Sequence, residues 1–251
     1  MTEPSFLETP QGRRIAYHAT PGSSPGIVFL GGFMSDMEGT KAVHLEAWCK
    51  AQGRAFLRFD YSGHGQSSER FEDGCIGDWA ADAEAAVTAL TDGPQLLIGS
   101  SMGGWISLLM AKRLPEKVAA LVTIAAAPDF TEDGYWAKFT PEERATLERE
   151  GQTKVPSDYD APYTITRRLI EDGRENLVLR EPLPLAIPTR FLQGTEDTDV
   201  PMERATTLLA HVTGPDIRLV ALKGADHSFS SPEALKLIED ATNNALDAIE
   251  A

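Results

Sequence analysis

The stretch Gly99-Ser100-Ser101-Met102-Gly103 carries a Gly-x-Ser-x-Gly pattern centred on Ser101. It follows the apolar residues 95–98 and precedes residues 102–113, which are predicted to be helical. A strand, a sharp turn and a helix in this order can present a serine as a nucleophile. The flanking glycines permit the tight turn, and the first N–H of the helix points toward a developing oxyanion. We therefore predict Ser101 as the nucleophile and the Met102 N–H as an oxyanion donor.

A serine hydroxyl needs a base to attack a carbonyl, and five histidines are available. His227 lies between the last predicted core strand and the final helix. His64 also lies in a loop after a core strand, but it precedes Ser101 in the chain. In sites built on this kind of turn, the chain order is serine, acid, histidine. This order favours His227 as the base and leaves His64 as the alternative.

The acid is expected after the strand predicted at residues 188–192, where three carboxylates fall within four residues. Asp197 lies in the turn itself, whereas Asp199 is better placed to cap the following helix. We therefore predict Asp197 as the acid. Its carboxylate would orient the imidazole of His227 and stabilise the charged form of that ring.

The loop Gly31-Gly32-Phe33 follows another buried strand and is expected to supply the second oxyanion donor through the Phe33 N–H. Four aromatic residues are candidates for the substrate pocket, namely Trp105, Trp136, Phe139 and Tyr163. For each of them the alternative is ordinary packing in the core or in an inserted segment. The serine turn, the acid turn, the late histidine and the early glycine loop all fall at the carboxyl ends of predicted strands, where doubly wound sheets place their sites.

Composition excludes several other functions. The 251 residues carry a formal net charge of −15, which disfavours nucleic acid and anionic membranes as partners. No apolar run reaches the roughly 18 residues that span a bilayer. Cys49 and Cys75 lack metal-ligand spacing and are expected to be free thiols in a reducing compartment. We expect no metal and no cofactor.

Apolar runs and helical patterns alternate along the chain, which predicts a mostly parallel, doubly wound α/β sheet. Strands are expected at residues 6–8, 14–18, 27–30, 55–59, 95–98, 118–124, 188–192 and 217–222. Helices are expected at residues 40–52, 79–90, 102–113, 201–211 and 231–249.

Residues 129–184 interrupt this alternation after the sixth predicted strand. They contain charges, prolines and scattered aromatics, and Thr140-Pro141-Glu142-Glu143 predicts a capped helix start. Such a segment is too long for a simple connection and suggests a helical cap. We therefore expect one domain, with a core of residues 1–128 and 185–251 and a lid of residues 129–184.

Residues 6–250 resemble the α/β-hydrolase superfamily. Several segments are similar to its palmitoyl-protein thioesterase and acyl-glucuronide esterase branch, namely residues 25–30, 39–42, 58–63, 99–105 and 115–118. The resemblance implies a serine esterase or thioesterase with Ser101, Asp197 and His227 as its triad and a cap over the acyl pocket. This chain departs from the branch in its oxyanion loop, which reads Gly-Gly-Phe instead of proline, glycine and an aromatic residue. The N-terminus lacks a presequence, so we expect a cytoplasmic, bacterial relative.

The expected substrate is therefore an ester or thioester, either a small molecule or an acyl-protein. A receptor that retains slow turnover remains an alternative, as do a peptidase, a lactonase and a carbon–carbon hydrolase of the same fold. A dehalogenase is disfavoured because such enzymes use a carboxylate where Ser101 stands. The sequence leaves open whether the protein is a monomer or a small homo-oligomer.

Overall fold

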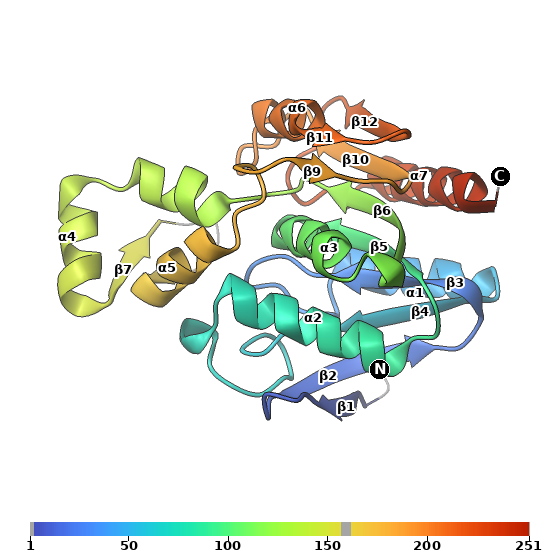
Figure 1. Cartoon of the computed structure of the whole chain (residues 1–251), viewed down its shortest axis with the longest axis horizontal. Coiled ribbons are helices and arrows are strands. Elements are labelled where there is room, and N and C mark those ends of the chain that lie inside the picture. The colour runs from blue at the N-terminus through green and yellow to red at the C-terminus, as the bar shows by residue number, and fades with distance from the viewer. Residues whose placement is uncertain (1–2, 157–161, 251) are drawn as a thin grey trace.

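The computed structural model describes residues 3–156 and 162–250. An eight-stranded sheet in the order β1-β2-β4-β3-β5-β6-β10-β12 runs through its centre (Figure 1). The strands are β1 Ser5–Glu8, β2 Arg14–Thr20, β3 Ser23–Leu30, β4 Arg54–Phe59, β5 Gln95–Ser100, β6 Val118–Ile124, β10 Thr189–Gly194 and β12 Ile217–Leu222.

The first two strands differ in direction from the rest of the sheet. β1 pairs with β2, and β2 with β4, in antiparallel fashion, whereas the pairings from β4 to β12 are parallel. The central strands are continuous buried runs because helices cover both faces of the sheet. The predicted mostly parallel α/β-hydrolase sheet is therefore confirmed.

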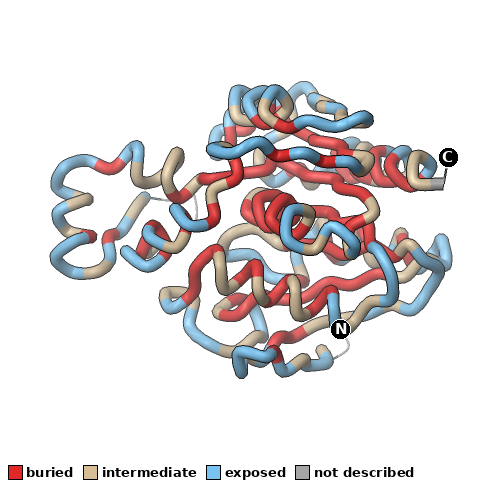
Figure 2. Tube along the Cα trace, in the orientation of Figure 1, coloured by how far each residue is buried: buried red, intermediate tan, exposed pale blue. Residues whose placement is uncertain are grey.

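Helices pack on both faces of the sheet. One face is covered by α1 Thr40–Ala51 and α7 Pro232–Glu250, which bury Leu45 and Ile238 against the strands. The other face is covered by α2 Ile76–Leu90, α3 Met102–Arg113 and α6 Met202–His211, which bury Trp79, Trp105 and Leu208. In Figure 2 the buried segments, in red, run through the central strands and the adjoining parts of the helices.

The parallel strands end at one edge of the sheet, and this edge carries the loops of interest. The loops after β3, β4, β5, β10 and β12 therefore converge, although they lie far apart in the sequence. A site assembled from residues 33, 101, 197 and 227 requires this convergence.

The segment between β6 and β9 Leu183–Pro184 projects to one side of the core (Figure 1). It contains a π-helical segment Phe130–Trp136, α4 Pro141–Glu150, β7 Gln152–Val155, β8 Tyr163–Thr166 and α5 Arg167–Glu175. The predicted capping box is present, since the Thr140 hydroxyl accepts from the Glu143 N–H. The structure adds an antiparallel β7–β8 pair to the predicted helical segment; its strands of four residues are too short for a clear alternating pattern.

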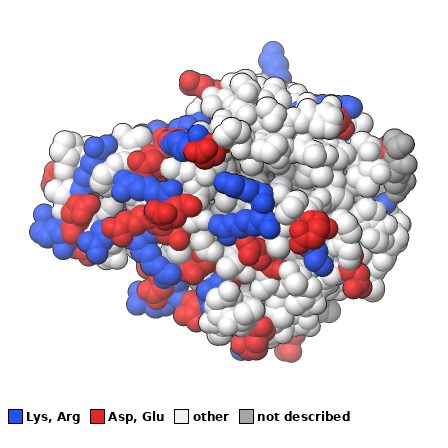
Figure 3. Space-filling model, in the orientation of Figure 1, with Lys and Arg blue, Asp and Glu red and all other residues white. Residues whose placement is uncertain are grey.

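Polar contacts tie this segment to the core. The Trp105 indole N–H donates to the Asn176 carbonyl at 3.0 Å, and the Gly77 N–H donates to the Asp172 carboxylate at 2.7 Å. On the face shown in Figure 3, basic and acidic side chains gather together over this segment and the adjoining core. One of its ion pairs, Arg168–Asp78, joins α5 to α2.

The close approach of α3 to β3 gives a stability prediction. A Cβ at Gly103 would overlap the backbone carbonyl of Leu30, so a Gly103→Ala variant should lose about 2 to 3 kcal/mol of unfolding free energy. A matched Gly134→Ala control, where the nearest atom to the new Cβ is 3.5 Å away, should change it by less than about 1 kcal/mol. Urea denaturation measures both values. Equal losses would contradict the close-approach argument.

Candidate active site

Ser101 occupies a strained turn between β5 and α3. Its backbone adopts φ 54° and ψ −116°, a conformation that residues with a Cβ rarely adopt. The turn is fixed on both sides, because the Ser101 N–H donates to the Ile124 carbonyl at 2.9 Å and the Ala127 N–H donates to the Ser101 carbonyl at 3.1 Å. Side chains at Gly99 or Gly103 would overlap backbone atoms, which explains the glycine spacing.

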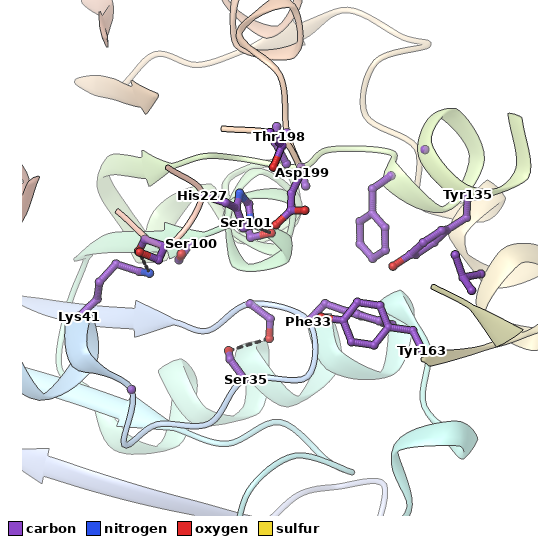
Figure 4. Close-up of a pocket in the computed structure, with 18 of the residues that line it drawn as sticks. Phe33, Ser35, Lys41, Ser100, Ser101, Tyr135, Tyr163, Thr198, Asp199 and His227 are labelled. Carbon is purple, nitrogen blue, oxygen red and sulfur yellow. Dashed lines mark hydrogen bonds between the residues drawn. The ribbon is translucent and has the colours of Figure 1, made fainter. Parts of the chain in front are cut away.

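The Ser101 hydroxyl lies at the end of a hydrogen-bonded chain of three side chains, of which Figure 4 labels Ser101 and His227. His227 Nε2 is 3.1 Å from Ser101 Oγ, and His227 Nδ1 is 2.9 Å from the Asp197 carboxylate. A carboxylate accepts hydrogen bonds, so Nδ1 carries the proton and Nε2 has a lone pair for the hydroxyl. The structure thus brings together the three predicted residues in an arrangement that can remove a proton from Ser101.

The Asp197 carboxylate is buried, and further hydrogen bonds satisfy it. Its side chain is 0 % exposed and accepts from the Gln193 amide at 3.0 Å and from the backbone N–H groups of Asp199 and Val200 at 3.0 and 2.8 Å. Buried charges require such partners. Asp199, the neighbouring candidate acid, instead lines the cavity described below.

The loop after β3 passes beside the nucleophile. A Cβ at Gly32 would lie 3.5 Å from the Ser101 Cβ, so the two segments are in near contact. Met102 is the first residue of α3, and its N–H therefore has no acceptor within the helix. In the described residues, the Phe33 N–H has no hydrogen-bond acceptor either. Both groups have the free donors that the predicted oxyanion role requires.

His64, the alternative base, supports this loop instead. Its Nδ1 lies 3.1 Å from the Ser62 carbonyl, and the Met34 N–H donates to its Nε2 at 3.3 Å. Both ring nitrogens therefore have backbone partners, and the residue is only 4 % exposed. Burial lowers the pKa of His64 from 6.5 to about 4, so its imidazole is neutral near pH 7. His64 thus fixes the loop that carries Phe33 rather than facing Ser101.

The Phe33 ring is held among other aromatic rings. Its centroid lies 4.8 Å from Phe71, 5.5 Å from Phe130 and 5.6 Å from Tyr163, in edge-to-face arrangements. Such contacts stabilise ring pairs by about 0.5–1.5 kcal/mol beyond burial. The side chain of Phe33 is therefore fixed, and its backbone N–H with it.

A cavity of about 590 Å³ opens beside Ser101 and His227. Of the four predicted pocket residues, Phe139 and Tyr163 line it. Five further residues on one side of the cavity were missed by the sequence analysis: Phe33, Phe130, Tyr135, Val155 and Pro156. These residues become neighbours only because the inserted segment faces the loop after β3. Tyr135 is one of the scattered aromatics of residues 129–184, but the sequence did not place it at the cavity.

Trp105 and Trp136 lie outside the cavity lining, which differs from the prediction. Trp105 is fully buried on α3, where its indole N–H donates to the Asn176 carbonyl of the inserted segment. Trp136 packs instead under two guanidinium groups, those of Arg144 and Arg174, at 4.9 and 4.6 Å. For both tryptophans, ordinary packing, the alternative to a place in the substrate pocket, is what the structure shows.

The described residues also bear on metal binding, cysteine chemistry and membrane insertion. Among the described residues no group of three or more His, Cys, Asp or Glu could hold a metal ion. Cys49 and Cys75 are free and buried, and burial raises the pKa of each thiol to about 12. Within the same residues, no helix combines the length and apolar character needed to cross a bilayer.

Comparison with known families identifies the class of protein to which this fold and site belong. The family model of the alpha/beta hydrolase fold matches residues 27–171. The chain therefore belongs to the α/β-hydrolase family.

Particular relatives are similar over nearly the whole chain. The mitochondrial palmitoyl-protein thioesterase ABHD10 of Rattus norvegicus is 34% identical over 247 residues, which cover 98% of this chain and 83% of the relative. The solved structure of ABHD10 from mouse superposes with a TM-score of 0.91 and 32% identity, covering 99% and 100% of the two chains. A protein of Agrobacterium vitis S4, named provisionally as a hydrolase, gives a TM-score of 0.93 and 35% identity, covering 97% and 98%.

The neutral His64 gives a pH prediction. Its pKa is lower in the folded chain than the ordinary histidine value of 6.5, so the unfolded chain takes up the proton first as pH falls. This group should cost the folded protein about 2 to 3 kcal/mol of unfolding free energy between about pH 7 and pH 4.5. A His64→Gln variant lacks the titration, so its unfolding free energy, measured with urea, should fall less over that range. Identical pH dependence in the two proteins would show that His64 is not held neutral.

Proposed function

We propose that this protein is a serine hydrolase that cleaves esters or thioesters of apolar acyl groups through an acyl-enzyme. The observation that carries the proposal is the chain of contacts from Ser101 through His227 to the buried Asp197, at the wall of a cavity. Family membership and the relatives' names support the same chemistry.

In the proposed acylation, Ser101 Oγ attacks the acyl carbonyl carbon and its proton passes to His227 Nε2. The carbonyl oxygen becomes an oxyanion and accepts hydrogen bonds from the Phe33 and Met102 N–H groups. Asp197 stabilises the imidazolium that has formed, because its carboxylate accepts from Nδ1 at 2.9 Å.

The second half of the reaction reverses these roles. The imidazolium donates its proton to the departing alcohol or thiol as the bond to the acyl carbon breaks. A water molecule then attacks the acyl-enzyme while His227 accepts its proton, and Ser101 leaves with a proton returned to Oγ. No cofactor takes part in this scheme.

The acyl group is assigned to the aromatic side of the cavity. The rings of Phe33, Phe130, Tyr135 and Tyr163 meet there, and all four residues line the cavity. Three of them, all except Phe33, belong to the inserted segment. Residues 129–184 would thus form a lid over the acyl group, as an expected part of the proposal. Both small acyl esters and acyl-proteins fit this scheme, the latter because the relatives are named palmitoyl-protein thioesterases.

The compartment is a further part of the proposal. Two free, buried cysteines are in keeping with a reducing compartment such as the cytoplasm. The relatives are named mitochondrial, and fractionation of the native host cell distinguishes the two locations.

Substitution of adjacent serines tests the proposal. Ser101→Ala should lower kcat for 4-nitrophenyl esters and acyl-thioesters by about four orders of magnitude or more, because the nucleophile is lost. Ser100→Ala is the matched control: Ser100 is buried and lines the same cavity, but among the described residues it has no hydrogen bond to His227, and kcat of this variant should fall less than about tenfold.

Comparable loss in both variants, or full activity in Ser101→Ala, would contradict the proposed nucleophile. A pre-steady-state measurement separates enzyme from receptor. An initial burst followed by slow product release of less than one turnover per hour in the wild type would instead favour the receptor-type alternative, while rapid steady turnover supports the hydrolase. Peptide, lactone and carbon–carbon substrates tested beside the esters decide among hydrolases of this fold.

A further inference from the structure

Lys41 lies on the opposite side of the cavity from the aromatic rings. It belongs to the first turn of α1 and lines the same cavity as Ser101 and His227. Its ammonium donates to the Ser228 carbonyl at 2.5 Å, directly beside the histidine loop (Figure 4). Lys41 therefore reaches across to the loop that carries His227.

The half-buried Lys41 differs in its partners from two buried cations of the protein. Arg58 pairs with Glu38 and Glu46, and Arg190 pairs with Asp216, all within 3 Å. In the part of the chain that the structure describes, Lys41 has no carboxylate within 4.0 Å. The Ser228 carbonyl, a neutral acceptor, is its hydrogen-bond partner there.

The Lys41 ammonium has more hydrogen-bond donors than the protein acceptor found for it. It has three N–H donors, of which the Ser228 carbonyl takes one. Lys41 is half-buried, and burial lowers the pKa of its ammonium. A desolvated cation without a counter-ion is costly in a folded protein. In a chain of net charge −15, the lack of a paired carboxylate at this point is therefore informative.

Nearby acidic groups do not supply the missing counter-ion. Asp226 attracts Lys41 through space, but its carboxylate accepts from the Ser228 hydroxyl at 2.8 Å and from the Phe229 N–H at 3.2 Å. Asp36 lines the cavity and accepts from the Glu38 N–H at 2.9 Å. These acids shape the field around Lys41 without pairing with it.

The two sides of the cavity then suit two parts of one substrate. In Figure 4 Ser101 and His227 lie between Lys41 on one side and Phe33, Tyr135 and Tyr163 on the other. An acyl group that packs against the aromatic rings places the alcohol or thiol of the scissile bond toward Lys41. The first turn of α1 adds to the same field, since it contains no acidic residue and no capping side chain.

We propose that Lys41 is a specificity residue that binds an anionic oxygen group on the leaving alcohol or thiol of the substrate. The group is a carboxylate or a phosphate, because both place charged oxygens within reach of the two remaining N–H donors. The inference rests on the proposed function, since it assigns the second half of the substrate of the same site. It predicts that the enzyme prefers anionic over neutral leaving groups of equal size.

Matched pairs of substrates test this assignment and distinguish the two sources of charge. The carboxylate pair is 4-nitrophenyl octanoate and its 3-carboxy derivative, and the phosphate pair is octanoyl-pantetheine and octanoyl-4′-phosphopantetheine. Members of a pair share the acyl group and the scissile bond. For the wild type and each variant, the ratio of kcat/KM between the anionic and the neutral member is measured, so intrinsic reactivity cancels when proteins are compared.

Lys41→Met should lower this ratio about tenfold or more for at least one pair, as expected for loss of a charge-assisted hydrogen bond. Lys41→Arg retains the charge and should restore most of the ratio. Added salt should lower the wild-type ratio relative to that of Lys41→Met, because screening weakens the attraction between Lys41 and the anionic group. The matched control is Lys138→Met, a second lysine at the cavity on the inserted segment, which should leave the ratio unchanged.

The outcomes separate the inference from its foundation. An equal loss for neutral and anionic substrates in Lys41→Met would make Lys41 a brace of the histidine loop and overturn the proposal. An equal fall of the ratio in Lys138→Met would overturn the assignment to Lys41. Wild-type turnover of neutral esters tests the hydrolase function separately, and its absence would remove that function. Thermal unfolding of each variant excludes misfolding as the cause.

Discussion

The strained turn at Ser101 is the constraint on which the site depends. A side chain held at φ 54° requires neighbours that tolerate close approach, and Gly99 and Gly103 provide it. The same turn places the serine hydroxyl within 3.1 Å of His227 and the start of α3 beside it. Strain in the backbone is thus linked directly to the geometry of proton transfer.

A second layer of contacts keeps the surrounding loops in register with that turn. The loop after β4 braces the loop after β3: the Asp60 carboxylate accepts from the Met37 N–H at 2.6 Å, and His64 accepts from the Met34 N–H. Both supports are buried, and burial raises the pKa of Asp60 and lowers that of His64. Elements with no direct role in the proposed chemistry therefore fix where the Phe33 N–H, one of the two proposed oxyanion donors, lies.

The sequence alone was sufficient to predict those features of the site that depend on a local pattern of residues. The elbow at Ser101, the turn holding Asp197 and the late position of His227 each follow from neighbours along the chain. The cavity was less accessible, because its lining depends on how residues 129–184 pack on the core. Trp105 and Trp136 resemble Phe139 and Tyr163 as aromatics, yet only tertiary contacts decide which of them face the cavity. Lys41 was also hidden, since a lysine in the first turn of a helix is ordinarily a surface residue.

Covalent labelling with a fluorophosphonate most directly tests whether Ser101 is made reactive by His227. Peptide mass spectrometry of the wild type should show one phosphonyl group, on Ser101, and labelling of a His227→Gln variant should be slower by about three orders of magnitude. Modification of a different residue, or equal labelling rates in the two proteins, would contradict the account.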